Sequence, residues 1–236
     1  MLVEIWSDVV CPWCYIGKRR FEEALRRFAH ADQVEVEWRA FELDPGARSV
    51  AVGEGADYAD RLARKYGTSR AGAQQMLDSM TEAAAAEGLD FRFDRAAAAN
   101  TFAAHQVIHL AAERGVQDRV KERLLRAYFT EGEPVGDRDT LVRLAAQAGL
   151  DRDEVAQALD SGLHADAVRA EEDEARALGI SGVPFFVVER RYGVSGAQPA
   201  EQLLQVLERA WEERRPTLQM AGPTDGGACG PDGCAL

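Results

Sequence analysis

The N-terminal stretch LVEIWSDVVCPWC, residues 2–14, decides the fold. Residues 2–6 form a short apolar run that predicts a buried strand, and the pair Cys11 and Cys14 follows it closely. Pro12 fits the first position of a helix, because the N–H that proline lacks would be unpaired there. We therefore expect a strand that leads into a helix, with Cys11 at or near the N-cap and Cys14 about one turn further on.

This placement predicts thiol–disulfide exchange. The positive end of a helix dipole stabilises a thiolate, so we expect a lowered pKa at Cys11 and a sulfur that points toward solvent. Cys14 should lie deeper, within disulfide reach, and should resolve the mixed disulfide formed on Cys11. A zinc knuckle, which uses cysteines at the same spacing, and an inert pair remain open. The strand-to-helix context favours redox chemistry over both.

The rest of the chain predicts an α/β protein with one interrupted sheet. Apolar residues recur at helical spacing in residues 21–28 and alternate with glutamates in residues 34–38, which predicts a helix and then a strand. From about Gly53 to Gly179 the pattern is helical, and its glycine breaks indicate about five to seven helices. Residues 183–188 and 192–195 predict two further strands, followed by a helix from about Pro199.

These patterns give three expected parts. Residues 1–50 and 180–215 form one sheet-containing domain, residues 51–179 form a helical insertion, and residues 216–236 form a flexible tail rich in glycine and proline. A sheet interrupted by helices explains this order better than two tandem domains do.

A proline stands at the entrance of the expected strand 183–188. A cis bond between Val183 and Pro184 would expose the backbone of Val183, so that an extended substrate could pair with it strand to strand. A plain trans proline that begins the strand is the alternative.

Five segments of the chain resemble the DsbA-like thiol oxidoreductases of the thioredoxin superfamily, and most of all their FrnE-type cytoplasmic branch. They are SDVVCPWCYIG (7–17), RAFELDP (39–45), NTFAAH (100–105), SGVPFF (181–186) and SGAQ (195–198). The resemblance spans residues 1 to about 215. It implies a thioredoxin fold, with a mixed sheet, interrupted by an all-α helical insertion domain.

The resemblance also implies site residues. Pro184 is expected to be cis and to face Cys11, and the helix that begins near Asn100 is expected to face the active-site cleft. This makes His105 a candidate to tune Cys11. Pro12, which directly follows Cys11, is a separate candidate for the same role.

The chain departs from the oxidising periplasmic members in two places. They carry histidine between the cysteines, where this chain has Trp13, and an acidic residue six positions before the first cysteine, where it has Ile5. An indole cannot stabilise a thiolate by charge. We expect Trp13 to be exposed beside the cysteines and to contact substrate, while Trp6, Trp38 and Trp211 pack in the core or against the sheet.

The charge composition limits the classes of partner that the protein is expected to bind. Forty acidic residues against 28 basic ones give a net charge of −12, which disfavours binding to nucleic acid or to anionic membranes. The N-terminus lacks the pattern of a secretion signal, and we expect a cytoplasmic protein, a monomer or homodimer. A dithiol there is mostly reduced. The expected activity is therefore disulfide reduction or isomerisation, with disulfide-bearing proteins or glutathione as partners and with no resident cofactor or metal.

Other polar residues have simple interpretations. His105 and His109 are four positions apart, but the third ligand of a metal motif is not placed with them, so helix-packing or surface histidines are favoured. The acidic run at residues 171–174 predicts a solvated helix face.

The tail carries a second cysteine pair, Cys229 and Cys234, around a Gly-Pro-Asp-Gly turn. A disulfide in so short and exposed a loop is readily reduced, which suits an auxiliary redox couple. Metal capture, alone or as a four-sulfur site with Cys11 and Cys14, and an inert tail are the alternatives.

Three functions compete at this point. The first is a protein thiol–disulfide oxidoreductase. The second is a glutathione-dependent small-molecule transferase or isomerase, like the kappa-type transferases and hydroxychromene-carboxylate isomerases, with a role in polyketide tailoring as one version. Those enzymes typically carry serine where this chain has Cys11, so the intact pair argues against them. The third is a metal-binding or chaperone module.

Overall fold

The computed structural model describes residues 1–50, 53–54 and 57–214. Its strands are β1 (Leu2–Ser7), β2 (Glu35–Ala40), β3 (Phe185–Val188) and β4 (Tyr192–Ser195). Its α-helices are α1 (Pro12–Arg27), α2 (Tyr58–Tyr66), α3 (Arg70–Ala86), α4 (Phe102–Glu113), α5 (Gln117–Arg126), α6 (Arg138–Gln147), α7 (Arg152–Ser161), α8 (Ala165–Ala177) and α9 (Ala200–Glu212). A 3-10 turn, η1 (Ala31–Gln33), and a π turn, η2 (Ala127–Glu131), complete the described elements.

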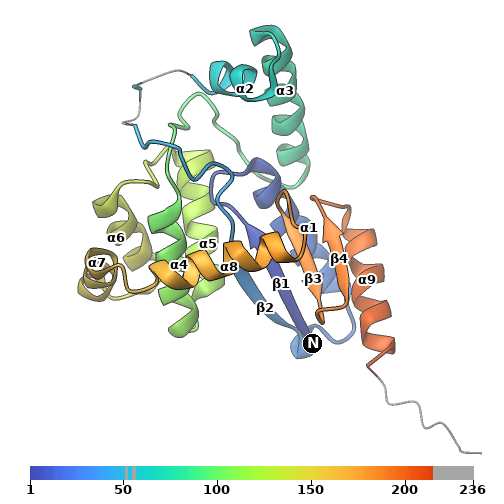
Figure 1. Ribbon diagram of the computed structural model, residues 1–236. Coiled ribbons are helices and arrows are strands. Elements are labelled where there is room, and N and C mark those ends of the chain that lie inside the picture. The colour runs from blue at the N-terminus through green and yellow to red at the C-terminus, as the bar shows by residue number, and fades with distance from the viewer. Residues whose placement is uncertain (51–52, 55–56, 215–236) are drawn as a thin grey trace, which may run out of the picture.

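The four described strands form one mixed sheet in the order β2-β1-β3-β4 (Figure 1). β2 runs parallel to β1, whereas β3 and β4 pair antiparallel. Between β2 and β3 the chain leaves the sheet and makes α2 to α8. The expected thioredoxin fold with a helical insertion is therefore confirmed.

The two faces of β1 point to different layers. Val3 and Ile5 are fully buried in the main core with residues of α1 and α9, whereas Trp6 packs with Ala175 of α8. Figure 1 shows α8 crossing one face of the sheet and α1 lying behind the other. Alternation along β1 thus assigns each side chain to its layer.

Seven α-helices lie between β2 and β3 in the described residues, which agrees with the expected number. Gly67 and Gly162 end α2 and α7 with φ values of +61° and +66°, in the left-handed region where glycine is favoured. None of the helices within residues 1–50, 53–54 and 57–214 is long and apolar enough to cross a membrane.

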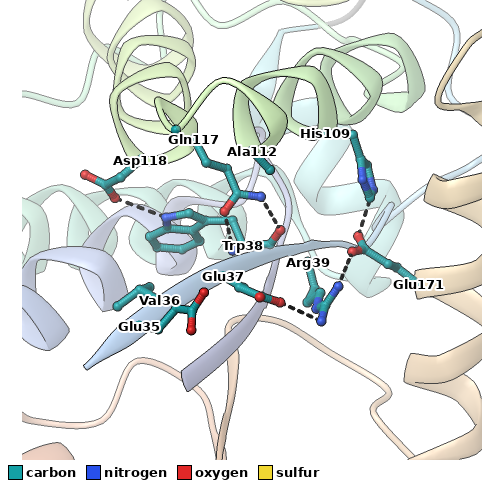
Figure 2. Close-up of a pocket in the computed structure, with 11 residues that line it drawn as sticks. Glu35, Val36, Glu37, Trp38, Arg39, His109, Ala112, Gln117, Asp118 and Glu171 are labelled. Carbon is teal, nitrogen blue, oxygen red and sulfur yellow. Dashed lines mark hydrogen bonds and ion pairs between the residues drawn. The ribbon is translucent and has the colours of Figure 1, made fainter. Parts of the chain in front are cut away.

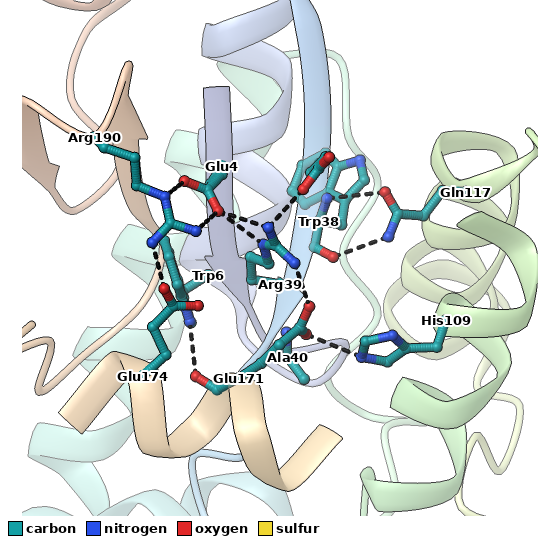
Figure 3. Close-up of polar contacts among 11 residues, drawn as sticks. Glu4, Trp6, Trp38, Arg39, Ala40, His109, Gln117, Glu171, Glu174 and Arg190 are labelled. Carbon is teal, nitrogen blue, oxygen red and sulfur yellow. Dashed lines mark hydrogen bonds and ion pairs between the residues drawn. The ribbon is translucent and has the colours of Figure 1, made fainter. Parts of the chain in front are cut away.

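The expectation that residues 171–174 form a solvated face is wrong at its first position. Glu171 is buried, and its carboxylate accepts hydrogen bonds from Arg39 (2.9 Å) and from the backbone N–H of Ala40 (2.6 Å). His109 of α4 lies 3.0 Å from the same carboxylate (Figure 3). The reason is that α8 returns the chain to the sheet and buries one side against β2, where Arg39 supplies the opposite charge.

A second buried carboxylate lies beside this contact. Glu4 of β1 is fully buried and is paired with Arg39 and Arg190, and Arg190 also reaches Glu174 of α8 (Figure 3). Glu4 and Glu171 therefore tie α8 to both β1 and β2 through Arg39. Alternating positive and negative groups satisfy charges that would otherwise be costly to bury.

Candidate active site

The cysteine pair begins α1, as the sequence predicts. Cys11 is the N-cap residue, with extended backbone (φ −94°, ψ 114°), and Pro12 occupies the first turn. The backbone N–H of Cys14 donates to the carbonyl of Cys11 over 3.0 Å. Both cysteines are free thiols. The site lies where β1 ends, so the strand and the helix together fix the position of the two sulfurs.

The loop before β3 reaches Cys11. The Val183–Pro184 peptide bond is cis, which confirms the expectation from the resemblance. The Cys11 thiol donates to the carbonyl oxygen of Val183 across 3.5 Å, at a sequence separation of 172 positions. Residues from the two ends of the chain therefore meet at one sulfur.

Burial distinguishes the residues of the CPWC turn. Cys11 is 4% exposed and Cys14 is 0% exposed, so Cys11 holds the outer sulfur, although both thiols are more covered than expected. Trp13 is 41% exposed beside them, as predicted. Trp6 and Trp38 lie in the core, and Trp211 packs against Phe28, which also agrees with the prediction.

The pKa values of the two thiols move in opposite directions. A hydrogen bond with Cys14 and burial raise the pKa of Cys11 well above its ordinary value. Burial also raises the pKa of Cys14, but the hydrogen bond from Cys11, the charge of Lys121 and the hydroxyl of Ser7 outweigh it and lower that pKa. The lowered pKa expected for Cys11 is therefore wrong for the dithiol, because the hydrogen bond with Cys14 and burial raise it, and the charge of Lys121 lowers the pKa of Cys14 instead.

Lys121 is the feature that the sequence analysis missed. It is fully buried on α5, and its ammonium donates to the backbone carbonyl of Ser7 across 3.3 Å. Burial lowers the pKa of Lys121 to about 8, although Cys14 and Asp8 act in the other direction. A signal was present: Lys121 falls between Val120 and Leu124, two core positions of one helix face.

His105 acts on the site through Asp8. The two side chains are each 1% exposed, and His105 Nε2 lies 3.5 Å from a carboxylate oxygen of Asp8. Burial raises the pKa of Asp8, but His105 and the N–H of Leu43 outweigh it and leave it lowered. The Asp8 carboxylate in turn raises the pKa of Cys11. His105 thus lies behind Asp8 rather than against the sulfur.

These features can be compared with known proteins. Residues 2–208 match the family described as a DSBA-like thioredoxin domain. The chain belongs to this family. It is similar to the crystal structure of a probable DsbA oxidoreductase from Streptomyces coelicolor, with 48% identity and a TM-score of 0.84, over 100% of this chain and 99% of that one.

More distant structures share the DSBA-like fold alone. The cytosolic disulfide reductase DsbM from Pseudomonas aeruginosa, solved with GSH, has 20% identity and a TM-score of 0.61 over 90% of this chain and all of that one. A 2-hydroxychromene-2-carboxylate isomerase has 13% identity and a TM-score of 0.64 over 90% of this chain and 97% of that one.

The DSBA-like domain has a separate hollow of about 470 Å³ on the outer side of β2 (Figure 2). Its lining includes Arg39 and Trp38 of β2, His109 of α4 and Gln117 of α5. The side-chain amide of Gln117 bonds both the N–H and the carbonyl of Trp38, and Asp118 accepts from the indole of Trp38 over 3.0 Å. This hollow therefore marks where α5 is fastened to the sheet.

The two histidines that stand four positions apart on α4 contact different carboxylates. His109 pairs with Glu171, and His105 pairs with Asp8. Across the described residues, no group of three or more His, Cys, Asp or Glu side chains could hold a metal ion. The auxiliary pair Cys229 and Cys234 lies outside the described residues.

Proposed function

We propose that this protein is a cytoplasmic protein thiol–disulfide oxidoreductase that reduces or isomerises disulfides through Cys11 and Cys14. The observation that carries the proposal is the contact of the Cys11 thiol with the carbonyl of Val183, 3.5 Å away, beside the cis proline. It brings a dithiol at a helix N-terminus together with a backbone segment able to receive an extended chain. The glutathione poise of a cytoplasm, about −220 to −320 mV, keeps such a dithiol mostly reduced.

Cys11 is the attacking group because its sulfur is the outer one. The lowered pKa of Cys14 and the raised pKa of Cys11 make Cys14 the favoured thiolate of the resting pair, and this thiolate is the adjacent base that takes the Cys11 proton as Cys11 attacks. The Cys11 thiolate then attacks a substrate disulfide, forms a mixed disulfide and releases one substrate sulfur as a thiolate. Cys14 attacks the Cys11 sulfur next, releases the second substrate thiol and leaves a Cys11–Cys14 disulfide.

The residues near Cys11 are expected to contact the substrate. An extended peptide would pair with the backbone of Val183, and Pro184 would hold that backbone at the mouth of the site. The exposed indole of Trp13, which stands between the two cysteines in the sequence, offers apolar contact to the peptide. Backbone pairing and one aromatic contact suit substrates of varied sequence.

Insulin reduction tests the proposal. The reduced protein should accelerate the precipitation of insulin chains in the presence of dithiothreitol, while Cys11→Ser should not exceed the uncatalysed rate. A wild-type rate no higher than that of Cys11→Ser would overturn the assignment.

A glutathione-dependent small-molecule transferase or isomerase is the second candidate, because the fold is shared with a 2-hydroxychromene-2-carboxylate isomerase. That likeness concerns the fold alone. The resolving thiol separates the two functions. A small-molecule enzyme of that kind would keep its turnover in Cys14→Ser, whereas a disulfide reductase would stop at the mixed disulfide.

The tail pair Cys229 and Cys234 is proposed as an auxiliary couple that exchanges electrons with Cys11 and Cys14. Deletion of residues 229–236 should then slow insulin turnover while leaving single-turnover attack by Cys11 intact. Unchanged turnover together with unchanged zinc content would leave the tail inert, and zinc loss alone would assign it to metal capture.

A further inference from the structure

Two buried lysines face the same aromatic ring from different helices. Lys18 of α1 and Lys121 of α5 place their ammonium groups 5.9 Å and 5.5 Å from the centre of the Trp38 ring. Each is 2% exposed or less. Since burying an ammonium is costly, each lysine needs a compensating partner.

The partners of the two lysines differ. Lys18 is paired with three carboxylates, those of Glu22, Asp118 and Glu122. The ammonium of Lys121 has one hydrogen-bond partner among the described residues, the carbonyl of Ser7. No carboxylate of the described residues lies within ion-pair distance of it. Lys18 is therefore neutralised locally, whereas the charge of Lys121 is available to the end of β1.

Three of the four ionisable groups that act most strongly on Lys121 belong to the site. Cys14, Cys11 and Lys18 belong to α1 and its N-cap, and Asp8 comes from the turn after β1. Asp8 is itself paired with His105 of α4. Cys14 is the group whose charge acts most strongly on Lys121 and the one that must ionise to complete the exchange.

The helical insertion holds Lys121 in place. Gln117 and Asp118, in the first turn of α5, bond the backbone and indole of Trp38, and Figure 2 shows both reaching down from their helix to β2. Lys121 follows one turn later on the same helix, where its ammonium reaches the carbonyl of Ser7 at the end of β1. The contacts that hold Lys121 in place come from the helical insertion and from β2, and they involve no residue of the CPWC motif.

We propose that Lys121 is a positioning residue, whose ammonium stabilises the thiolate of Cys14 when Cys14 attacks the mixed disulfide on Cys11. In that step the Cys14 thiol gives its proton to water, and its sulfur bonds to the Cys11 sulfur. The bond from Cys11 to the substrate sulfur breaks, and the substrate leaves as a thiolate that takes a proton from water. The inference rests on the proposed dithiol exchange. It gives Lys121 a role in the second step of that exchange, the attack of Cys14 on the mixed disulfide.

The first test titrates Cys14 alone. In the Cys11→Ser background, thiolate absorbance at 240 nm should give a pKa for Cys14 that rises by about one unit or more in Lys121→Met, as expected for the loss of an adjacent opposite charge. Lys121→Arg, which keeps the charge, should restore most of the shift. Lys18→Met is the matched control, since it removes the other lysine over Trp38 and should move the pKa of Cys14 far less.

The second test follows exchange with 5,5′-dithiobis(2-nitrobenzoate). Attack by Cys11 releases one thionitrobenzoate, and resolution by Cys14 releases the other. At pH 7 the second release should slow about tenfold in Lys121→Met, and its pH profile should move upward by the same interval as the Cys14 titration. Equal second-phase profiles in Lys121→Met and Lys18→Met would overturn the proposal.

A reciprocal measurement tests the same interaction in case Lys121→Met does not fold. Charges that influence each other must do so equally, so nitrogen-15 NMR of the Lys121 amine should show a lower pKa in Cys14→Ser than in the reduced wild type. An unchanged value would overturn the proposal. None of these readouts uses a protein disulfide. A shifted Cys14 titration without insulin reduction would therefore refute the proposed function alone, and the reverse result would refute the role of Lys121 alone.

Discussion

Gly17 lies directly against Pro184. A Cβ atom built on Gly17 would come within 2.8 Å of the Cγ atom of Pro184, closer than side chains approach one another. The ring of Pro184 therefore packs closely against α1 at Gly17 and leaves no room for a side chain there. Pro184 directly follows Val183, whose carbonyl accepts from the Cys11 thiol, so we expect the Gly17–Pro184 approach to influence the distance between Val183 and Cys11.

Replacing Gly17 with alanine should separate the loop from the helix. We expect insulin reduction to fall about 10-fold to 100-fold, because a displacement near 1 Å is enough to disturb reacting groups. Thermal unfolding and the insulin rate would be measured side by side. Gly46→Ala is the control, since its added Cβ would meet its nearest neighbour at an ordinary 3.5 Å. An unchanged rate in Gly17→Ala would show that the spacing does not matter.

Trp13→Ala should weaken substrate contact without destabilising the protein. The indole is 41% exposed, and truncation of an exposed side chain usually changes stability by less than about 0.5 kcal/mol. KM for insulin should rise several-fold, while reaction with a small disulfide should stay near the wild-type rate. Leu163→Ala, at an exposed site on the insertion, serves as the control. A loss that is equal for large and small disulfides would assign Trp13 to the chemistry instead.

Glu171 should make the fold sensitive to acid. Burial raises its pKa, but His109, Arg39 and the N–H of Ala40 outweigh this and hold the pKa below the ordinary 4.5. A lowered folded-state pKa stabilises the fold above the unfolded value, and the stabilisation is lost as pH falls through the folded value. The free energy of unfolding should thus decline below about pH 4.5.

Glu171→Gln tests this directly by denaturant titration at several pH values. It should cost about 1.5–3 kcal/mol at pH 7, the range for a hydrogen bond to a charged group, and should flatten the decline between pH 4.5 and 3. Glu172→Gln, at the next position of the acidic run, should have a smaller effect. A decline as steep as that of the wild type would place the acid sensitivity elsewhere.

The parts of the site that were predictable are local in sequence. Pro12 after Cys11 marks the helix start from the adjoining residues alone, and the cis bond before Pro184 follows from the resemblance carried by its own segment. The order of strands and helices also follows from periodicity. Such features need no knowledge of which distant segments meet.

The parts that were not predictable depend on distant contacts. Lys121 reaches Ser7 across 114 positions, and Glu171 reaches Ala40 across 131. A lone lysine on a helix or a run of acidic residues is most often solvated, so pattern alone assigns both to the surface. The same contacts explain why the pKa expected for Cys11 was wrong, since helix dipole and N-cap position do not reveal a buried lysine whose charge acts on Cys14.

The central claim is that Cys11 attacks and Cys14 resolves. The direct measurement is to mix reduced Cys14→Ser with an equal amount of insulin, block free thiols with acid and alkylating reagent, and locate the adduct by peptide mass spectrometry. We predict a stable mixed disulfide on Cys11 in Cys14→Ser and little adduct in Cys11→Ser. An adduct that forms on Cys14 in Cys11→Ser as fast as on Cys11 in Cys14→Ser, or none in either variant, would contradict the account.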